Sequence, residues 1–185
     1  MNGTQRKKGT IALGGTARRP EDVETLIDLG LEFAEIPIEN IGIFKHNFSK
    51  YLAFLEGNRF YFLCHGPKEG DPNDIASLRE TYAPYLVEIL QLMPTLGMSL
   101  LTVHLWLDRR FVKPDVLDFK VDILHDNLGG PSPADDLHLP PGKGTVDFPA
   151  IFEGLRKAGY KGTATLELAP DEIKSCIGFI RTLSS

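Results

Sequence analysis

The chain has 185 residues, and 42% of them are hydrophobic, which is enough for one domain with a buried core. Its net charge of −5 and pI near 5.5 argue against nucleic acid as a partner. Two cysteines are too few for a disulfide framework, and no apolar run reaches the roughly 20 residues of a membrane span. We therefore expect a cytoplasmic protein without a membrane partner.

Strand-like and helix-like runs alternate along the chain, which predicts a parallel sheet with crossover helices. Strands are expected at about 10–14, 31–38, 60–65, 99–106, 121–126 and 163–168. Helices are expected at 20–30, 48–55, 75–96 with a kink at Pro84, 147–158 and 171–183. Gly30 and Gly159 are expected to end the helices that precede them. The pattern predicts a single α/β domain over residues 1–185.

The parity of strand residues predicts which side chains face the interior of a parallel barrel. In the run 163–168 the even positions are apolar and suit the helix-facing layer. Glu167 then points inward near the C-terminal end of its strand. A carboxylate there is costly to bury without a cation or hydrogen-bond donors, which favours a functional role for Glu167.

Three further polar residues end strand-like runs. His65 and His104 are the last inward residues of neighbouring strands, and Glu35 has a comparable place. Polar side chains at C-terminal strand ends form the active sites of parallel barrels. Each residue alone has a structural alternative, a hydrogen-bonded histidine or a solvated carboxylate, but two histidines at equivalent positions favour function. Trp106, just past His104, either stacks on a ligand or caps the barrel.

The segment from 125 to 147 is the richest in metal-binding side chains. It contains His125-Asp126-Asn127, Asp136-Leu137-His138, the turn Pro140-Pro141-Gly142-Lys143-Gly144, and Asp147. Imidazole and carboxylate groups bind borderline divalent metals. Lys143 between two glycines is a candidate substrate contact, although neither the spacing nor the context is that of a P-loop or a dinucleotide fingerprint.

Four motifs in this order resemble the seventh and eighth βα units of the xylose isomerase-like TIM barrels: His125-Asp126-Asn127, Asp136-x-His138, Gly142-x-Gly144-x-x-Asp147-Phe148 and Thr165-Leu166-Glu167. The N-terminal half is similar in the same register, through Ala34-Glu35-Ile36, His65-Gly66-Pro67 and Val103-His104. The superfamily includes sugar phosphate isomerases and epimerases and the metal-dependent apurinic endonucleases.

The resemblance implies a barrel with divalent metal at its rim, zinc or manganese first and magnesium or cobalt as alternatives. The residues that match metal ligands are His65, His104, Asp136, His138 and Glu167. In an enzyme of this kind we expect Glu35 or Glu167 to act as acid or base. The expected substrate contacts are His65, His104, Trp106 and Lys143.

The chain also departs from the family. The glutamate of strand five and the aspartate of strand six have no counterpart, and Ile123 stands where a ligand histidine is expected. A complete barrel takes about 250 residues, so this chain has room for about six βα units. We therefore expect an incomplete TIM-type barrel of about six parallel strands with outer helices and an internal deletion near 119–124. Its open sheet edges predict either a strained closure or a homodimer.

Three functions remain open. The first is a metal-dependent sugar or sugar phosphate isomerase or epimerase, with activity impaired by the missing ligands of strands five and six. The second is an apurinic endonuclease-like phosphodiesterase, favoured by Asp136 and His138 but opposed by the acidic charge. The third is a non-catalytic barrel remnant.

Overall fold

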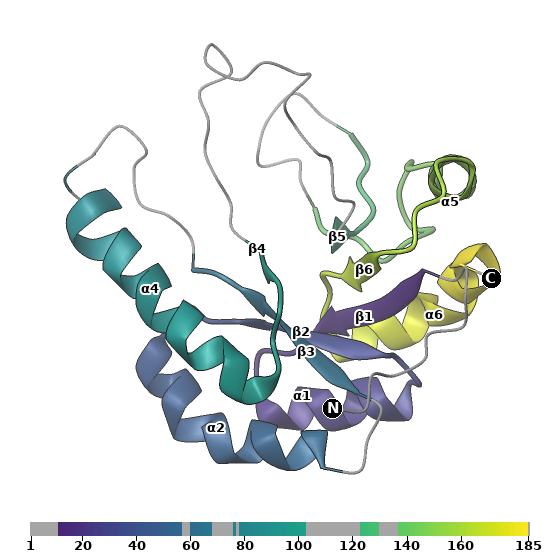
Figure 1. The fold of residues 1–185 in the computed structure, drawn as a ribbon. Coiled ribbons are helices and arrows are strands. Elements are labelled where there is room, and N and C mark those ends of the chain that lie inside the picture. Colours follow the sequence, from purple (N-terminus) through teal and green to yellow (C-terminus); the bar gives the residue numbers. More distant parts are fainter. Residues whose placement is uncertain are drawn as a thin grey trace. The chain divides into compact units, whose positions relative to one another are not determined.

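The computed structural model describes residues 11–56, 60–67, 76, 78–102, 123–129 and 137–184. The chain divides into two compact units, one of Met1–Ala34 with Val121–Ser185 and one of Glu35–Lys120. The boundary falls within strand β2 (Phe33–Pro37). Each unit combines parallel strands with helices, which confirms the expected α/β class (Figure 1). Closure into a barrel stays a prediction.

The first unit contains three neighbouring strands, β1 (Ala12–Thr16), β6 (Thr163–Leu166) and β5 (Ile123–Leu124). β6 pairs in parallel with β1 on one side and with β5 on the other. Glu32 N donates to Leu13 O at 2.9 Å, which brings the chain that enters β2 against β1. The described residues of this unit also form three helices, α1 (Pro20–Asp28), α5 (Phe148–Lys157) and α6 (Pro170–Ser184).

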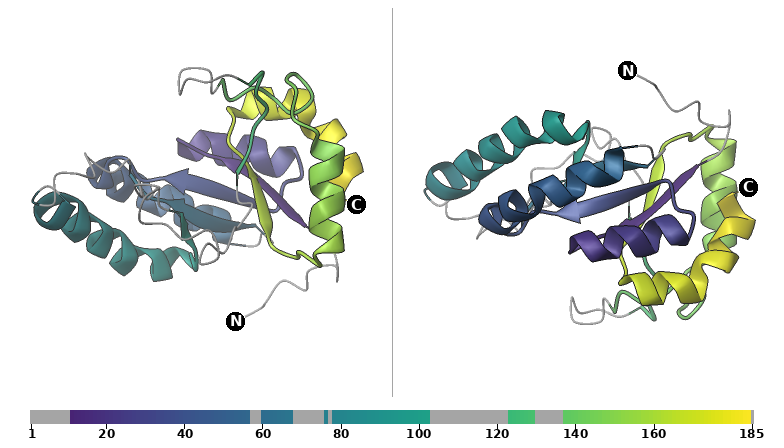
Figure 2. Two further views of the ribbon diagram at one scale, coloured as in Figure 1. Left: turned by 90° about the horizontal axis from the view of Figure 1, so that it is seen from above. Right: turned by 90° about the horizontal axis from the view of Figure 1, so that it is seen from below.

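The environment of Gly15 shows which face of this sheet meets the helices. A Cβ on Gly15 would lie 2.6 Å from Ile173 of α6 and 2.8 Å from Leu26 of α1, so helices cover that face. Gly15 is the register partner of Leu166, and Thr165 lies on the opposite face because side chains alternate along a strand. The alternation expected for β6 is therefore confirmed. Figure 2 shows β1 and β6 side by side with α6.

Two helices of this unit end where the sequence predicts. α1 stops just before Gly30, and α5 just before Gly159, and both glycines have a φ of 68°. A left-handed residue after a helix suits glycine because it has no Cβ. At its start, α5 is capped by Asp147, whose Oδ1 accepts from Ala150 N at 3.0 Å.

The second unit places β3 (Tyr61–His65) between β2 and β4 (Leu101–Thr102). β3 pairs in parallel with β4, with His65 opposite Thr102, and Ile38 N donates to His65 O at 2.8 Å. α2 (Ile41–Leu55) and α4 (Ala83–Leu92) lie side by side (Figures 1 and 2). Lys45 pairs with Glu88 between these helices, and Ile41 N donates to Tyr85 Oη at 2.6 Å.

Two helix predictions for this unit need correction. The helix expected at 48–55 begins at Ile41, because Asn40 caps it by accepting from Ile43 N at 3.0 Å. The helix expected at 75–96 is irregular where it is described. A π-helical turn (η1, Leu78–Tyr82) precedes Pro84, and a 3-10 turn (η2, Met93–Leu96) follows α4. Proline lacks the amide hydrogen of a helix interior, which explains the interruption at the expected kink.

Two strand predictions are met only in part. The strand expected at 99–106 is described as far as Thr102, and the rest lies outside the described residues. The strand expected at 121–126 is described from Ile123 and ends at Leu124, because Asp126 forms an antiparallel bridge with Leu139 instead of extending the parallel pairing. Most of the junction expected at 119–124 also lies outside the described part. None of the described helices combines the length and the apolar character needed to cross a membrane.

Candidate metal centre

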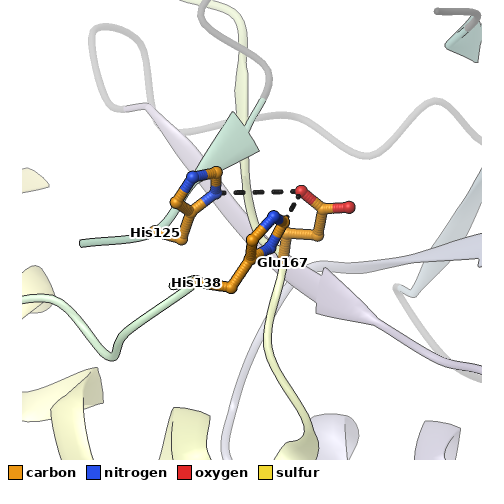
Figure 3. Close-up of side chains that lie close together, drawn as sticks. All are labelled: His125, His138 and Glu167. Atoms are coloured by element: carbon orange, nitrogen blue, oxygen red, sulfur yellow. Dashed lines mark ion pairs between the residues drawn. The ribbon is translucent and has the colours of Figure 1, made fainter. Parts of the chain in front are cut away.

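Two potential metal ligands follow the paired strands β5 and β6. Leu124 and Leu166 are register partners, so the next residue of each strand, His125 and Glu167, lies at the same level. Nδ1 of His125 is 3.8 Å from Oε2 of Glu167 (Figure 3). Both side chains are 22% exposed, so the pair is accessible at the C-terminal end of the strands.

A third ligand, His138, reaches the pair through a two-residue bridge. Asp126 N donates to Leu139 O at 2.6 Å, and Leu139 N donates to Asp126 O at 2.8 Å. His125 and His138 directly precede the two bridge partners, so the bridge brings these histidines close together. Their rings stack with centroids 4.0 Å apart, and His138 Nδ1 lies 3.6 Å from Glu167 Oε2 (Figure 3).

Asp126 holds together the loop that carries this bridge. The residue is fully buried, and its carboxylate accepts four backbone hydrogen bonds of 2.7 to 3.0 Å, from Asn127, Gly142, Gly144 and Val146. Burial alone would raise the pKa of Asp126, but these four amides together lower it below its usual value. Gly144 has no room for a side chain, because a Cβ there would overlap Asp126 Oδ1 and the Asn127 carbonyl.

His138 adopts a backbone conformation that costs energy. Its φ of 46° makes it the only non-glycine residue of positive φ in the described chain. For an L-residue the left-handed region costs roughly 1–2 kcal/mol. The bridge through Leu139 maintains that conformation and directs the imidazole toward Glu167.

The three ligand atoms suit a shared metal ion better than direct hydrogen bonds. Separations of 3.6 and 3.8 Å exceed hydrogen-bond range. They lie close to the edge of roughly 3.4 Å for a tetrahedron with metal–ligand bonds of about 2.1 Å. Over the described residues, His125, His138 and Glu167 form the one group of metal-binding side chains with ligand atoms within 4.8 Å of one another.

A buried hydroxyl adds polar character to the same sheet face. Thr165 precedes Glu167 by two residues, and its Oγ1 is buried with no hydrogen-bond partner in the described part of the chain. Buried polar atoms are usually satisfied, and exceptions accompany sites that take water or a ligand. Two imidazoles and one carboxylate match the ligand sets of catalytic zinc sites that keep a fourth position for water or substrate.

The other predicted site residues have different locations. Asp136, His104 and Trp106 lie outside the described residues. Lys143 is exposed on the turn that closes over Asp126, and its backbone N donates to Pro140 O at 3.0 Å. His138 and Glu167, both predicted ligands, lie together in the first unit.

Glu35 and His65 belong to the second unit, where they pair with each other. Glu35 Oε1 lies 2.8 Å from His65 Nδ1, a hydrogen bond with side chains only 2% and 14% exposed. Burial, and then the nearby charge of Glu35, raises the pKa of Cys64 to about 12. The role of Glu35 as an acid or base stays a prediction, and so does the role of His65 as a metal ligand.

The sequence placed His125 and Asp126 in a segment rich in metal-binding side chains, but neither residue was predicted as a ligand. His125 was passed over because family alignment placed Ile123 at the ligand position. One pattern could have identified His125. It follows the apolar end of its strand by one residue, as Glu167 does, and the two strands pair with each other. For Asp126, the turn Pro140-Pro141-Gly142-Lys143-Gly144 exposes backbone amides that need a nearby acceptor.

Comparisons with protein-family models, curated proteins and solved structures found no match. The interpretation of this cluster as a metal centre therefore rests on the geometry of its own residues.

Proposed function

We propose that the protein is a divalent-metal-dependent enzyme that binds its ion through His125, His138 and Glu167 and acts on a sugar or sugar phosphate as an isomerase or epimerase. The observation that carries the proposal is the convergence of two imidazole nitrogens and a carboxylate oxygen within 4.8 Å. Their position just beyond the C-terminal ends of parallel strands supports a catalytic role.

The ligand set favours zinc or manganese, with cobalt as a close alternative. Imidazole nitrogen suits these ions, whereas magnesium prefers an all-oxygen shell. When bound, such an ion polarises a carbonyl oxygen and so acidifies the adjacent carbon–hydrogen bond. The protein's part is to present the imidazoles of His125 and His138, which flank the bridge that Asp126 anchors, together with the carboxylate of Glu167 at the end of β6.

The sugar class rests on the order of the motifs between His125 and Glu167 and on their resemblance to sugar isomerases. The net charge of −5 weighs against an abasic DNA substrate, since a nuclease of that type needs a basic surface for phosphate contacts. A phosphodiesterase and a non-catalytic metal-binding remnant are the alternatives that the experiments below distinguish.

Calorimetric titration with zinc and with manganese tests the centre itself. The protein is prepared without a histidine tag, and wild type is compared with His138→Ala and Glu167→Gln. We expect both variants to bind zinc at least about tenfold more weakly, because each removes one of three ligands. His46→Ala, an exposed histidine on α2, is the matched control and keeps wild-type affinity. Equal, weak binding by all four proteins would refute the proposal.

A substrate screen tests the reaction class. Metal-loaded protein is incubated in deuterium oxide with aldose and ketose phosphates, and with an abasic oligonucleotide in a parallel reaction. Deuterium uptake next to the sugar carbonyl that Glu167→Gln abolishes supports the isomerase or epimerase. Strand cleavage without deuterium uptake supports the phosphodiesterase, and tight metal binding without either reaction supports the remnant.

A further inference from the structure

The first unit contains a cavity of about 210 Å³ at the start of β1, at the opposite end of the sheet from the metal centre. Its walls come from the start of β1, the connection between α1 and β2, and the last turn of α6. A single water needs only about 10–15 Å³, whereas pockets for drug-sized ligands measure roughly 300–1,000 Å³. The cavity therefore has room for a small organic molecule.

Part of the cavity wall is aliphatic. Ile11, Leu13 and Leu31 line it, and each is buried. Leu13 faces the helices, as Gly15 does, because alternate side chains of a strand share a face. An aliphatic group in the cavity would contact these three side chains and leave water.

Arg181 contributes a positive charge that is held in place. Its Nη2 donates to the carbonyl oxygens of Leu29 and Gly30, at the end of α1. The last carbonyls of a helix lack partners within the helix and attract cations. Among the described residues, Nε and Nη1 of Arg181 have no acceptor. These two nitrogens can therefore donate to a carboxylate on a ligand.

Glu32 contributes a negative charge to the same cavity. Its backbone N donates to Leu13 O at 2.9 Å, which fixes the residue beside β1. Its side chain is exposed and, within the described part of the chain, has no hydrogen-bond or ion-pair partner. Glu32 and Arg181 thus line one cavity without pairing with each other. A ligand with only one charge would be repelled by one of them, whereas a ligand with both charges suits the two.

We propose that this cavity binds a zwitterionic α-amino acid with an aliphatic side chain. The ligand carboxylate accepts from Arg181, and its ammonium group donates to Glu32. The side chain of the ligand lies against the aliphatic wall. The exposure of both charged residues gives the ligand a route from solvent. The inference does not depend on the metal centre or on the proposed reaction.

Ligand-observed NMR titration with L-leucine tests the site, with EDTA present to exclude a contribution from metal. Three analogues each lack one of the groups that the site recognises. Isocaproate has no ammonium group, isoamylamine has no carboxylate, and glycine has no side chain. We expect each analogue to bind at least severalfold more weakly than leucine.

Two variants assign the charges to their partners. Glu32→Gln is expected to lower leucine affinity about two- to fivefold, the range of an exposed ion pair, and to leave isocaproate binding unchanged. Arg181→Gln is expected to lower leucine affinity by a similar factor and to leave isoamylamine binding unchanged. Glu24→Gln, at an exposed position on α1 outside the cavity lining, keeps wild-type affinity for leucine.

Circular dichroism melts show whether each variant folds. If Arg181→Gln does not fold, because Arg181 also satisfies the end of α1, Glu32→Gln carries the test alone. Lack of leucine binding by wild type, or equal leucine affinity in wild type and folded Glu32→Gln, overturns the proposal. Isocaproate binding as tight as that of leucine also overturns it, because the cavity would then be a site for organic anions.

Discussion

The two units each bring histidine and glutamate together, but with different geometry. In the second unit, Glu35 and His65 are 2.8 Å apart and almost fully buried, so they share a hydrogen bond. In the first, Glu167 lies 3.6 and 3.8 Å from two histidines and is 22% exposed. The short contact in the second unit satisfies the imidazole of His65 with a direct hydrogen bond. The longer separations in the first unit leave space for an ion. Residue type alone therefore does not distinguish a hydrogen-bonded pair from a metal centre.

The difference follows from where the residues stand. Glu35 and His65 lie within strands, where neighbouring strands fix the backbone and bury the side chains. His125 and Glu167 lie just past their strands, and His138 arrives on a loop. Ligands at strand ends are held by loop contacts, and here Asp126 supplies them.

The largest expected effect comes from removing that anchor. Asp126→Ala leaves four backbone amides without their acceptor, and we expect it to destabilise the protein by about 4 kcal/mol. Zinc binding is lost with it. Urea unfolding and zinc calorimetry measure the two effects. Asp147→Ala, which removes only the cap of α5, costs about 1 kcal/mol and keeps zinc binding. Similar losses in both variants would contradict the anchoring role.

Metal binding is expected to stabilise the protein through the first unit's histidines. At zinc concentrations a hundredfold above Kd, stability increases by about 2.7 kcal/mol. Thermal melts with and without zinc measure the shift. At the same zinc concentration, Glu167→Gln lowers the shift to about 1.4 kcal/mol or less. Glu35→Gln keeps the full shift, because of these two residues only Glu167 belongs to the centre. If zinc no longer stabilised Glu35→Gln, the Glu35 and His65 pair would not differ from the metal centre as described.

A glycine pair tests how tightly the loop closes on Asp126. Gly144→Ala forces a methyl group onto the Asp126 carboxylate and the Asn127 carbonyl, and we expect a loss of about 2 kcal/mol. Gly154→Ala in α5 meets no atom within 4 Å and is expected to stabilise by up to about 1 kcal/mol. Chemical unfolding compares the two, and a neutral Gly144→Ala would show that the loop has room.

The smallest expected effect concerns Cys64, next to the Glu35 and His65 pair. Its pKa is raised from 9.0 to about 12, first by burial and then by Glu35. The buried neutral thiol of Cys64 therefore contributes its full share to the stability of the fold below pH 9. This contribution is lost as the pH rises toward 12. Glu35→Gln removes the charge contribution and lowers the pKa of Cys64 slightly. The pH dependence of Cys64 alkylation, in a Cys176→Ala background, measures this change in pKa. An identical pH profile with and without Glu35→Gln would exclude a contribution of the Glu35 charge.

Much of the local structure followed from the sequence. The alternation of strands and helices, the ends of two helices at Gly30 and Gly159, and the alternation along β6 are confirmed. These features depend on neighbouring residues only. α2 starts earlier than predicted, because the cap at Asn40 sets the boundary and the apolar residues Ile41 and Phe44 already belong to the helix.

The sequence by itself determined which side chains suit chemistry: strand parity favoured a functional role for Glu167, and the family resemblance implied that His138 and Glu167 are ligands. Only the tertiary structure decided that His125 joins them and that Glu35 bonds His65. The physical reason is register. Pairing between β5 and β6, and the bridge between Asp126 and Leu139, unite residues far apart along the chain, and no local pattern specifies those pairings.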